Sequence, residues 1–226
     1  WQAYKPLSEA SIMRAQLGLG IMPPTDNQSS YTLGCNHQRL IYANIENADK
    51  QATAFRGRRI GCACTAKWIT VKGSDAWLWG GYHMLRMAQG RWVFIVENPI
   101  DALLVMQAMP DVIAIAGTAG AGTFPWVKLV ASTNPKGVLV WLDNDLIGNP
   151  MPQTRELLIR EWIANMRKRG HEPTADMIAH QRTKAMAPRL VAQFQALHVK
   201  SKAWEWAEGT LPRMDAGQYL INKGGL

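Results

Sequence analysis

From residue 91 to about residue 142, short apolar runs alternate with stretches of helical length. Apolar runs of strand length cover three segments: 93–96, 112–116 and 138–142. Helical patterns lie between them, over 99–109 and about 124–132. Because apolar strands that alternate with helices at this spacing are typical of βαβ units, we predict a parallel sheet with helices on its faces.

After residue 150 the pattern adds more helix to this sheet. Residues 153–169 show an apolar stripe that includes Leu158, Trp162 and Met166, and they end in a basic run. We expect this helix to pack on the sheet through its stripe; the alternative is a docking face for a partner protein. The pattern is completed by a helix and a late strand, over 186–197 and 200–206.

The first part of the chain has a different pattern. Short β-like runs at 39–44 and 52–55 predict a hairpin or meander, and the basic cluster Arg56-Gly57-Arg58-Arg59 follows directly. Before them, residues 8–20 predict a short helix. The predicted fold class is therefore α/β, with an N-terminal mixed α+β subdomain (1–89) followed by a Rossmann-like parallel-sheet subdomain (90–226).

Composition adds a preference for a polyanionic partner. The 226 residues include 25 Lys and Arg against 17 Asp and Glu, so the net charge is 25 − 17 = +8. This excess favours nucleic acid, although a solvated basic surface has the same composition. No apolar run reaches the length of a membrane span. Cys35, Cys62 and Cys64 make a poor disulfide framework, and their spacing is tighter than zinc sites favour, so we expect reduced cysteines in a cytoplasmic protein.

Acidic residues follow two of the predicted strands where each ends. Glu97 comes after the first apolar run, and Asp143 and Asp145 come after the third. Ligands gather at the carboxyl ends of parallel strands, and carboxylate oxygens are the ligands that Mg²⁺ prefers. We therefore predict a metal site for phosphate chemistry, with Asp101 as a supporting residue or a ligand of a second metal. The alternative is that these acids only cap the helices that follow.

Three motifs stand in order along this half: Val96-Glu97-Asn98-Pro99-Ile100-Asp101-Ala102, the loop 117–122, and Leu142-Asp143-Asn144-Asp145. Together they resemble the Toprim domain of bacterial primases, phage primase-helicases and type IA and II topoisomerases. The earlier half resembles the bacterial primase catalytic core in four segments: 17–19, 39–44, 54–58 and 67–70. A weaker similarity covers 211–220, where Asp215 matches the first acid of a late motif and Gly217 replaces the second.

The resemblance implies the RNA-polymerase core of a DNA primase, which makes short primers on single-stranded DNA from ribonucleoside triphosphates. It implies that Mg²⁺ or Mn²⁺ is bound by the catalytic acids Glu97, Asp143 and Asp145. Asp101 and Asp215 are the other two metal-binding acids that the resemblance implies. Four basic residues are candidates for binding nucleic acid or nucleotide: Arg56, Arg58, Arg59 and Lys67. A replicative helicase is a candidate partner, and no membrane is expected.

Two other functions stay open at this point. The same acids serve in Toprim nucleases, which hydrolyse a phosphodiester, and the chain can instead be a non-catalytic nucleic-acid-binding module. Asn98 stands where the family usually has Gly, and the stretch between Asp145 and Asp215 is longer than in the family. Both departures indicate a divergent member, from a phage or mobile element.

Overall fold

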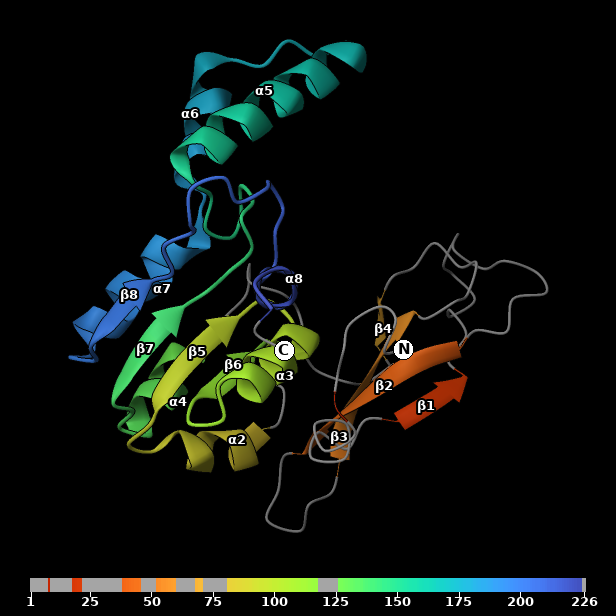
Figure 1. Cartoon of the computed structure of the whole chain (residues 1–226). Helices are drawn as coiled ribbons and strands as arrows, with labels where there is room; N and C mark the ends of the chain where they lie inside the picture. Colours follow the sequence, from red (N-terminus) through yellow and green to blue (C-terminus); the bar gives the residue numbers. More distant parts are fainter. Residues whose placement is uncertain are drawn as a thin grey trace.

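The computed structural model describes residues 8, 18–21, 38–45, 52–59, 68–70, 81–117 and 126–224. Within them the strands form an antiparallel and a parallel sheet (Figure 1). The antiparallel sheet contains β1 (Gly18–Ile21), β2 (Gln38–Ile45), β3 (Ala52–Arg59) and β4 (Trp68–Thr70). The parallel sheet contains β5 (Trp92–Val96), β6 (Ile113–Ala116), β7 (Gly137–Val140) and β8 (Ser201–Ala203). The helices are α2 (Gly81–Ala88), α3 (Pro99–Ala108), α4 (Val127–Ser132), α5 (Pro152–Lys168), α6 (Ala175–Thr183), α7 (Met186–Ala196) and α8 (Ala216–Asn222).

The first sheet is an antiparallel meander in the order β1-β2-β3-β4. β2 pairs with β3 along most of its length, which confirms the predicted hairpin or meander. Arg56 and Arg58 belong to β3 itself, because this strand extends beyond the predicted run 52–55 to Arg59. The helix predicted over 8–20 is wrong at its end, where β1 pairs with β2. Hydrogen bonding to a neighbouring strand there outweighs the local helix signals.

The second sheet has the order β6-β5-β7-β8, and all of its neighbouring strands are parallel. The chain leaves β5 in one direction to reach β6, and returns past it to reach β7 and β8. Because such crossovers are right-handed, the helices of the first and the later connections lie on opposite faces of the sheet. α3 packs on β5 and β6 with α8 against it, whereas α4 and α7 pack together on the other face. This architecture confirms the predicted α/β fold class.

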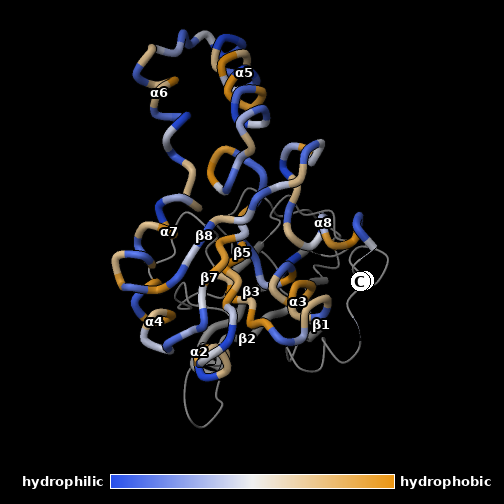
Figure 2. The backbone as a smooth tube through the Cα atoms, turned by 60° about the vertical axis from the view of Figure 1, so that its left-hand side comes forward, coloured by the Kyte–Doolittle hydropathy of each residue, from blue (hydrophilic) through white to orange (hydrophobic). Residues whose placement is uncertain are grey.

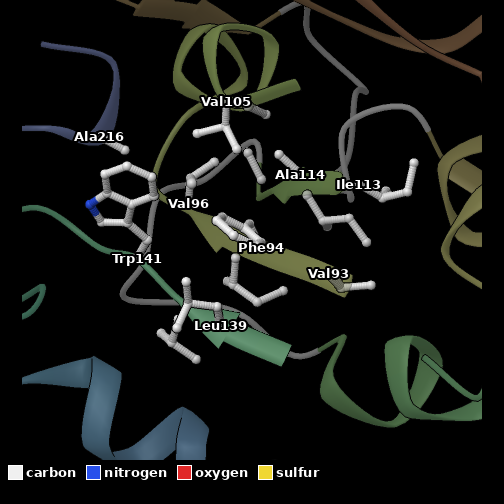
Figure 3. Packing of buried hydrophobic residues seen from close by; sticks show 14 of the residues in the cluster. Val93, Phe94, Val96, Val105, Ile113, Ala114, Leu139, Trp141 and Ala216 are labelled. Atoms are coloured by element: carbon white, nitrogen blue, oxygen red, sulfur yellow. The ribbon is translucent and has the colours of Figure 1, made fainter. Parts of the chain in front are cut away.

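The main hydrophobic core surrounds β5, β6 and β7 (Figure 3). β6 and β7 are buried throughout, and β5 is buried from Val93 to Val96. Since helices cover both faces, these strands are continuous apolar runs instead of an alternating pattern. α3 contributes buried residues from Pro99 to Met106. Because the strands are parallel, their carboxyl ends lie together at one edge of the sheet.

Between β7 and α7 the chain forms a projection, residues 151–185, which we call the arm. It contains α5 and α6 and extends beyond the carboxyl ends of β5 and β7 (Figures 1 and 2). The 17 residues of α5 span about 25 Å at 1.5 Å per residue. None of them belongs to the main core, although Leu158 and Ile159 are buried. The expectation that this helix packs on the sheet is wrong, because α6, which the sequence pattern did not reveal, packs against it instead.

α2 leads from the first sheet into the second. Met84, Leu85 and Ala88 of this helix belong to the core of the parallel sheet, while α2 also contacts β2. The boundary between the predicted subdomains 1–89 and 90–226 stays a prediction. Among the described helices, none has both the length and the apolar character needed to cross a membrane.

Candidate active site

Acidic side chains gather at the carboxyl edge of the parallel sheet. Glu97 directly follows β5, Asp143 follows β7 by three residues, and these two strands are hydrogen-bonded neighbours. Burial raises the pKa of Asp143, and neighbouring negative charges raise it further, from 3.8 to about 10. These charges, in order of their effect, belong to Glu97, Asp101, Asp215 and Asp145. The structure therefore brings all five acids that the sequence singled out within electrostatic range of one another.

The loop after β7 is closed on Asp143 by hydrogen bonds. The carbonyl oxygen of Asp143 accepts from the N–H of Asp145 at 2.8 Å and from that of Asn149 at 2.7 Å. The Asp145 carboxylate accepts from the N–H of Ile147 at 2.9 Å and from that of Gly148 at 2.7 Å. A Cβ on Gly148 would lie 2.3 Å from the Asp143 carbonyl oxygen, so only glycine permits this approach. Gly148 is missing from the predicted site, although a glycine so soon after paired acids signals a tight loop.

Asn144, between the paired acids, joins this loop to the segment that leads into α8. Its side chain is fully buried, donates to the carbonyl oxygen of Leu211 at 3.0 Å and accepts from the N–H of Met151 at 3.0 Å. Its backbone N–H donates to Met214 at 2.9 Å, and its carbonyl oxygen accepts from Arg213 at 2.7 Å. Sequence reasoning missed this role and had no signal for it, because the partners of Asn144 are distant along the chain.

Asn98 begins α3 beside Glu97. Its side-chain oxygen accepts from the N–H of Ile100 at 3.0 Å and from that of Asp101 at 3.2 Å. Its amide nitrogen donates to the Asp101 carboxylate, which is fully buried. The backbone of Asn98 is extended (φ −138°, ψ 158°), so no glycine is required at this position. The cap of α3 is therefore Asn98, and the capping alternative does not account for Glu97.

Asp215 begins α8 and reaches the site through helix packing. Its carboxylate accepts from the N–H of Gln218 at 2.6 Å, as an N-cap does. α8 packs against α3, the helix that carries Asp101. The contact between these two helices thus brings an acid from the end of the chain to the edge where β5 and β7 end.

An aromatic cluster lies next to the acids along the chain. Trp141, two residues before Asp143, stacks on Trp204 with ring centroids 3.9 Å apart and an interplanar angle of 14°. Tyr219, on α8, meets the ring of Trp206 edge-on at 5.5 Å and that of Trp141 at 5.9 Å. Trp141 and Trp206 are buried in this cluster. Burial is the largest cause of the raised pKa of Asp143, and the low dielectric of a buried site also strengthens the repulsion from the neighbouring carboxylates.

The donor set fits a hard divalent cation. Carboxylate oxygens are what Mg²⁺ and Mn²⁺ take, and a cation relieves the repulsion among the five acids. Among the described residues, no three acidic, His or Cys side chains stand in ligand geometry around one point. Asp145 and Asp215 each direct an oxygen to backbone N–H groups, and Asp101 is held by Asn98. The five side chains thus supply the right chemistry, while three of them, Asp101, Asp145 and Asp215, bond to the loop or to the helix starts.

The predicted basic residues are only partly described. Arg56, Arg58 and Arg59 lie on β3, and Arg58 is buried at 7% exposure. Lys67 lies outside the described residues, and so do the three cysteines and residues 118–122 of the glycine-rich loop. A contact of these basic residues with nucleic acid stays a prediction.

No protein-family model matches the sequence, and a search of curated proteins finds no match. Solved structures do match. The zinc-binding and RNA polymerase domains of Aquifex aeolicus primase are 17% identical with a TM-score of 0.55, over 97% of this chain and 51% of that one. The RNA polymerase domain of Mycobacterium tuberculosis primase DnaG is 12% identical with a TM-score of 0.53, over 99% of this chain and 71% of that one. A DnaG primase catalytic domain bound to ssDNA is 14% identical with a TM-score of 0.52, over 98% and 68%.

The fold is that of the DnaG-type primase catalytic core. The match covers both sheets, which confirms the resemblance to primase cores drawn from the sequence motifs. At 12% to 17% sequence identity, the similarity to these structures shows the fold alone. The chain spans about half the length of the Aquifex aeolicus primase fragment.

Proposed function

We propose that this protein is the nucleotidyltransferase core of a DNA primase. It would synthesise short RNA primers on single-stranded DNA from ribonucleoside triphosphates with Mg²⁺ or Mn²⁺. The observation that carries the proposal is the cluster of five carboxylates at the carboxyl edge of a primase-type fold, in which burial and four negative neighbours raise the pKa of Asp143 to about 10. Such a cluster is suited to hold divalent cations, and phosphoryl transfer depends on them.

Each acid has a role that follows from its place. Glu97 and Asp143, at the ends of neighbouring strands, would bind metal together with Asp145. Asp101 and Asp215, at the starts of α3 and α8, would support the site by their charge. A bound divalent cation would supply charge neutralisation at the transferring phosphate. The residues of the chain orient the acids: Gly148 and Asn144 fix the Asp143 loop, and Asn98 fixes Asp101.

Single-stranded DNA is the proposed template. One primase catalytic domain with this fold was solved bound to ssDNA. The net charge of +8 on this chain favours a polyanionic partner as well. Nucleotide substrates and a helicase partner are expectations from the sequence resemblance.

The test is incubation of the protein with single-stranded DNA, labelled ribonucleoside triphosphates and Mg²⁺ or Mn²⁺. We expect new labelled oligonucleotides. Asp143→Asn should lower synthesis by more than about 10²-fold, because the metal contributes several kcal/mol to the transition state and each 1.4 kcal/mol is tenfold. The matched control is Asp111→Asn, an exposed acid outside the cluster, which should leave synthesis unchanged. A shortened template without new oligonucleotides would indicate the nuclease instead, and no reaction at all would indicate a binding module.

A further inference from the structure

The positive charge of the second half of the chain is concentrated in the arm. Residues 91–226 hold 15 Lys and Arg against 12 Asp and Glu, and the arm alone (151–185) holds 7 against 4. Outside the arm this half is neutral, since 15 − 7 = 8 basic residues face 12 − 4 = 8 acidic ones. The whole excess of +3 therefore lies on the projection that leaves the acidic edge of the sheet.

Most of the acidic side chains of the arm are engaged in ion pairs. Three of its four acids are paired with arginines: Glu156 with Arg182, Glu161 with Arg213, and Glu172 with Arg167. Three other basic side chains of the arm are exposed and take part in no ion pair within the described residues: Arg160, Lys168 and Arg169. Arg160 and Lys168 lie eight residues apart on α5, about 12 Å along the axis. They place positive charge along the second half of the helix.

The arm is fastened to the acidic loop at both of its ends. At its start, the N–H of Met151 donates to the side chain of Asn144 at 3.0 Å. Directly after its end, the N–H of Met186, the first residue of α7, donates to the carbonyl oxygen of Ile147 at 2.7 Å. Glu161 of α5 also contacts Arg213, at 2.7 Å, on the segment before Asp215. The direction of the arm is therefore set by the same segments that carry Asp145 and Asp215.

We propose that the arm binds the phosphate backbone of nucleic acid held at the acidic site, through Arg160, Lys168 and Arg169. This inference rests on the proposed function and adds a nucleic-acid contact to it. A polyanion is the occupant that the charge distribution favours, because the positive excess is confined to the arm and the rest of this half is neutral. The contact is independent of base sequence, since Lys and Arg neutralise phosphates without reading base edges.

The experiment measures binding by fluorescence anisotropy across a salt series. The probes are fluorescein-labelled single-stranded DNA and the same DNA annealed to a short RNA. The arm variant changes Arg160, Lys168 and Arg169 to Gln. The control variant changes three exposed basic residues of the parallel-sheet region outside the arm, Arg91, Lys136 and Lys202, to Gln and so removes the same charge.

The arm variant should bind single-stranded DNA with a salt slope shallower by about 2, since each neutralised phosphate contributes about 0.7 to the slope. The control variant should keep the wild-type slope. Equal slopes and affinities for the two variants would overturn the proposal, and a protein would then be the better candidate for the arm. If the wild-type protein binds neither probe, the proposed function fails with it. If the wild-type protein binds and synthesises primers while the arm variant behaves as the control, only the arm proposal fails.

Discussion

The carboxyl group of Asp143 stands among four other acids, and its pKa is raised from 3.8 to about 10 by burial and then by their charges. Between pH 3.8 and about 10, the carboxyl group is therefore protonated in the native protein and ionised in the unfolded chain. The contribution of this group to stability is fully present below pH 3.8 and is lost as the pH rises toward about 10. A divalent cation that binds the carboxylate displaces this proton, so it should stabilise the fold more at alkaline than at acidic pH.

Thermal unfolding tests this at the residue scale. The metal-free protein should melt at a lower temperature as the pH rises through neutrality, and Mn²⁺ should raise the melting temperature with release of protons. Asp143→Asn should melt at a higher temperature than the wild type without metal, show a weaker pH dependence and lose most of the response to Mn²⁺. Asp111→Asn should behave as the wild type. An unchanged pH dependence in Asp143→Asn would mean that Asp143 does not carry the coupling.

At the scale of elements, the site is assembled by the contact between the loop after β7 and the segment before α8. Asn144 makes this contact through a buried side chain bonded to Leu211 and Met151. Asn144→Ala leaves the Leu211 carbonyl and the Met151 N–H without these partners, which should lower the free energy of unfolding by about 2–4 kcal/mol. Affinity for Mn²⁺ should fall too, because Asp215 is no longer held near Asp143.

The matched control for this prediction is Asn165→Ala, an exposed asparagine on α5. Its effect on denaturant unfolding should stay within about 0.5 kcal/mol, and metal affinity should not change. If Asn144→Ala matched Asn165→Ala in both measurements, the joining of the two segments would depend on other contacts, such as the Trp141–Trp204 stack.

At the scale of the whole molecule, positive charge occupies two regions, the first half of the chain and the arm. Residues 1–90 carry 10 Lys and Arg against 5 Asp and Glu, and they include the cluster on β3. Changing Arg56, Arg58 and Lys67 to Ala should flatten the salt dependence of DNA binding, by about 0.7 in slope for each phosphate that is no longer neutralised. Combined with the arm variant, the two effects should add, since distant sites without shared partners are independent.

Circular dichroism should accompany this measurement, because Arg58 is buried and its truncation also removes packing. The control is again the Arg91, Lys136 and Lys202 variant. A wild-type salt slope in a folded triple Ala variant would show that the path of the nucleic acid does not cross β3.

The sequence by itself determined the local parts of this protein. Continuous apolar runs predicted the three buried strands β5, β6 and β7, because strands covered on both faces need no polar alternation. Acids placed directly after two of those runs predicted where Glu97 and Asp143 lie, since parallel strands end at a common edge. The motif resemblance to primase cores pointed to the fold that the solved structures share.

Only the tertiary structure decided the features that depend on distant contacts. The backbone partners of Asn144 lie about seventy residues away along the chain, at Met214 and Arg213, and no periodicity in a sequence encodes such a pair. The pKa of Asp143 depends on burial and on Asp215, which α8 brings to α3. The packing partner of α5 was decided in the same way. The apolar stripe of this helix predicts that it packs against another element, but only the fold shows that this element is α6 and not the sheet.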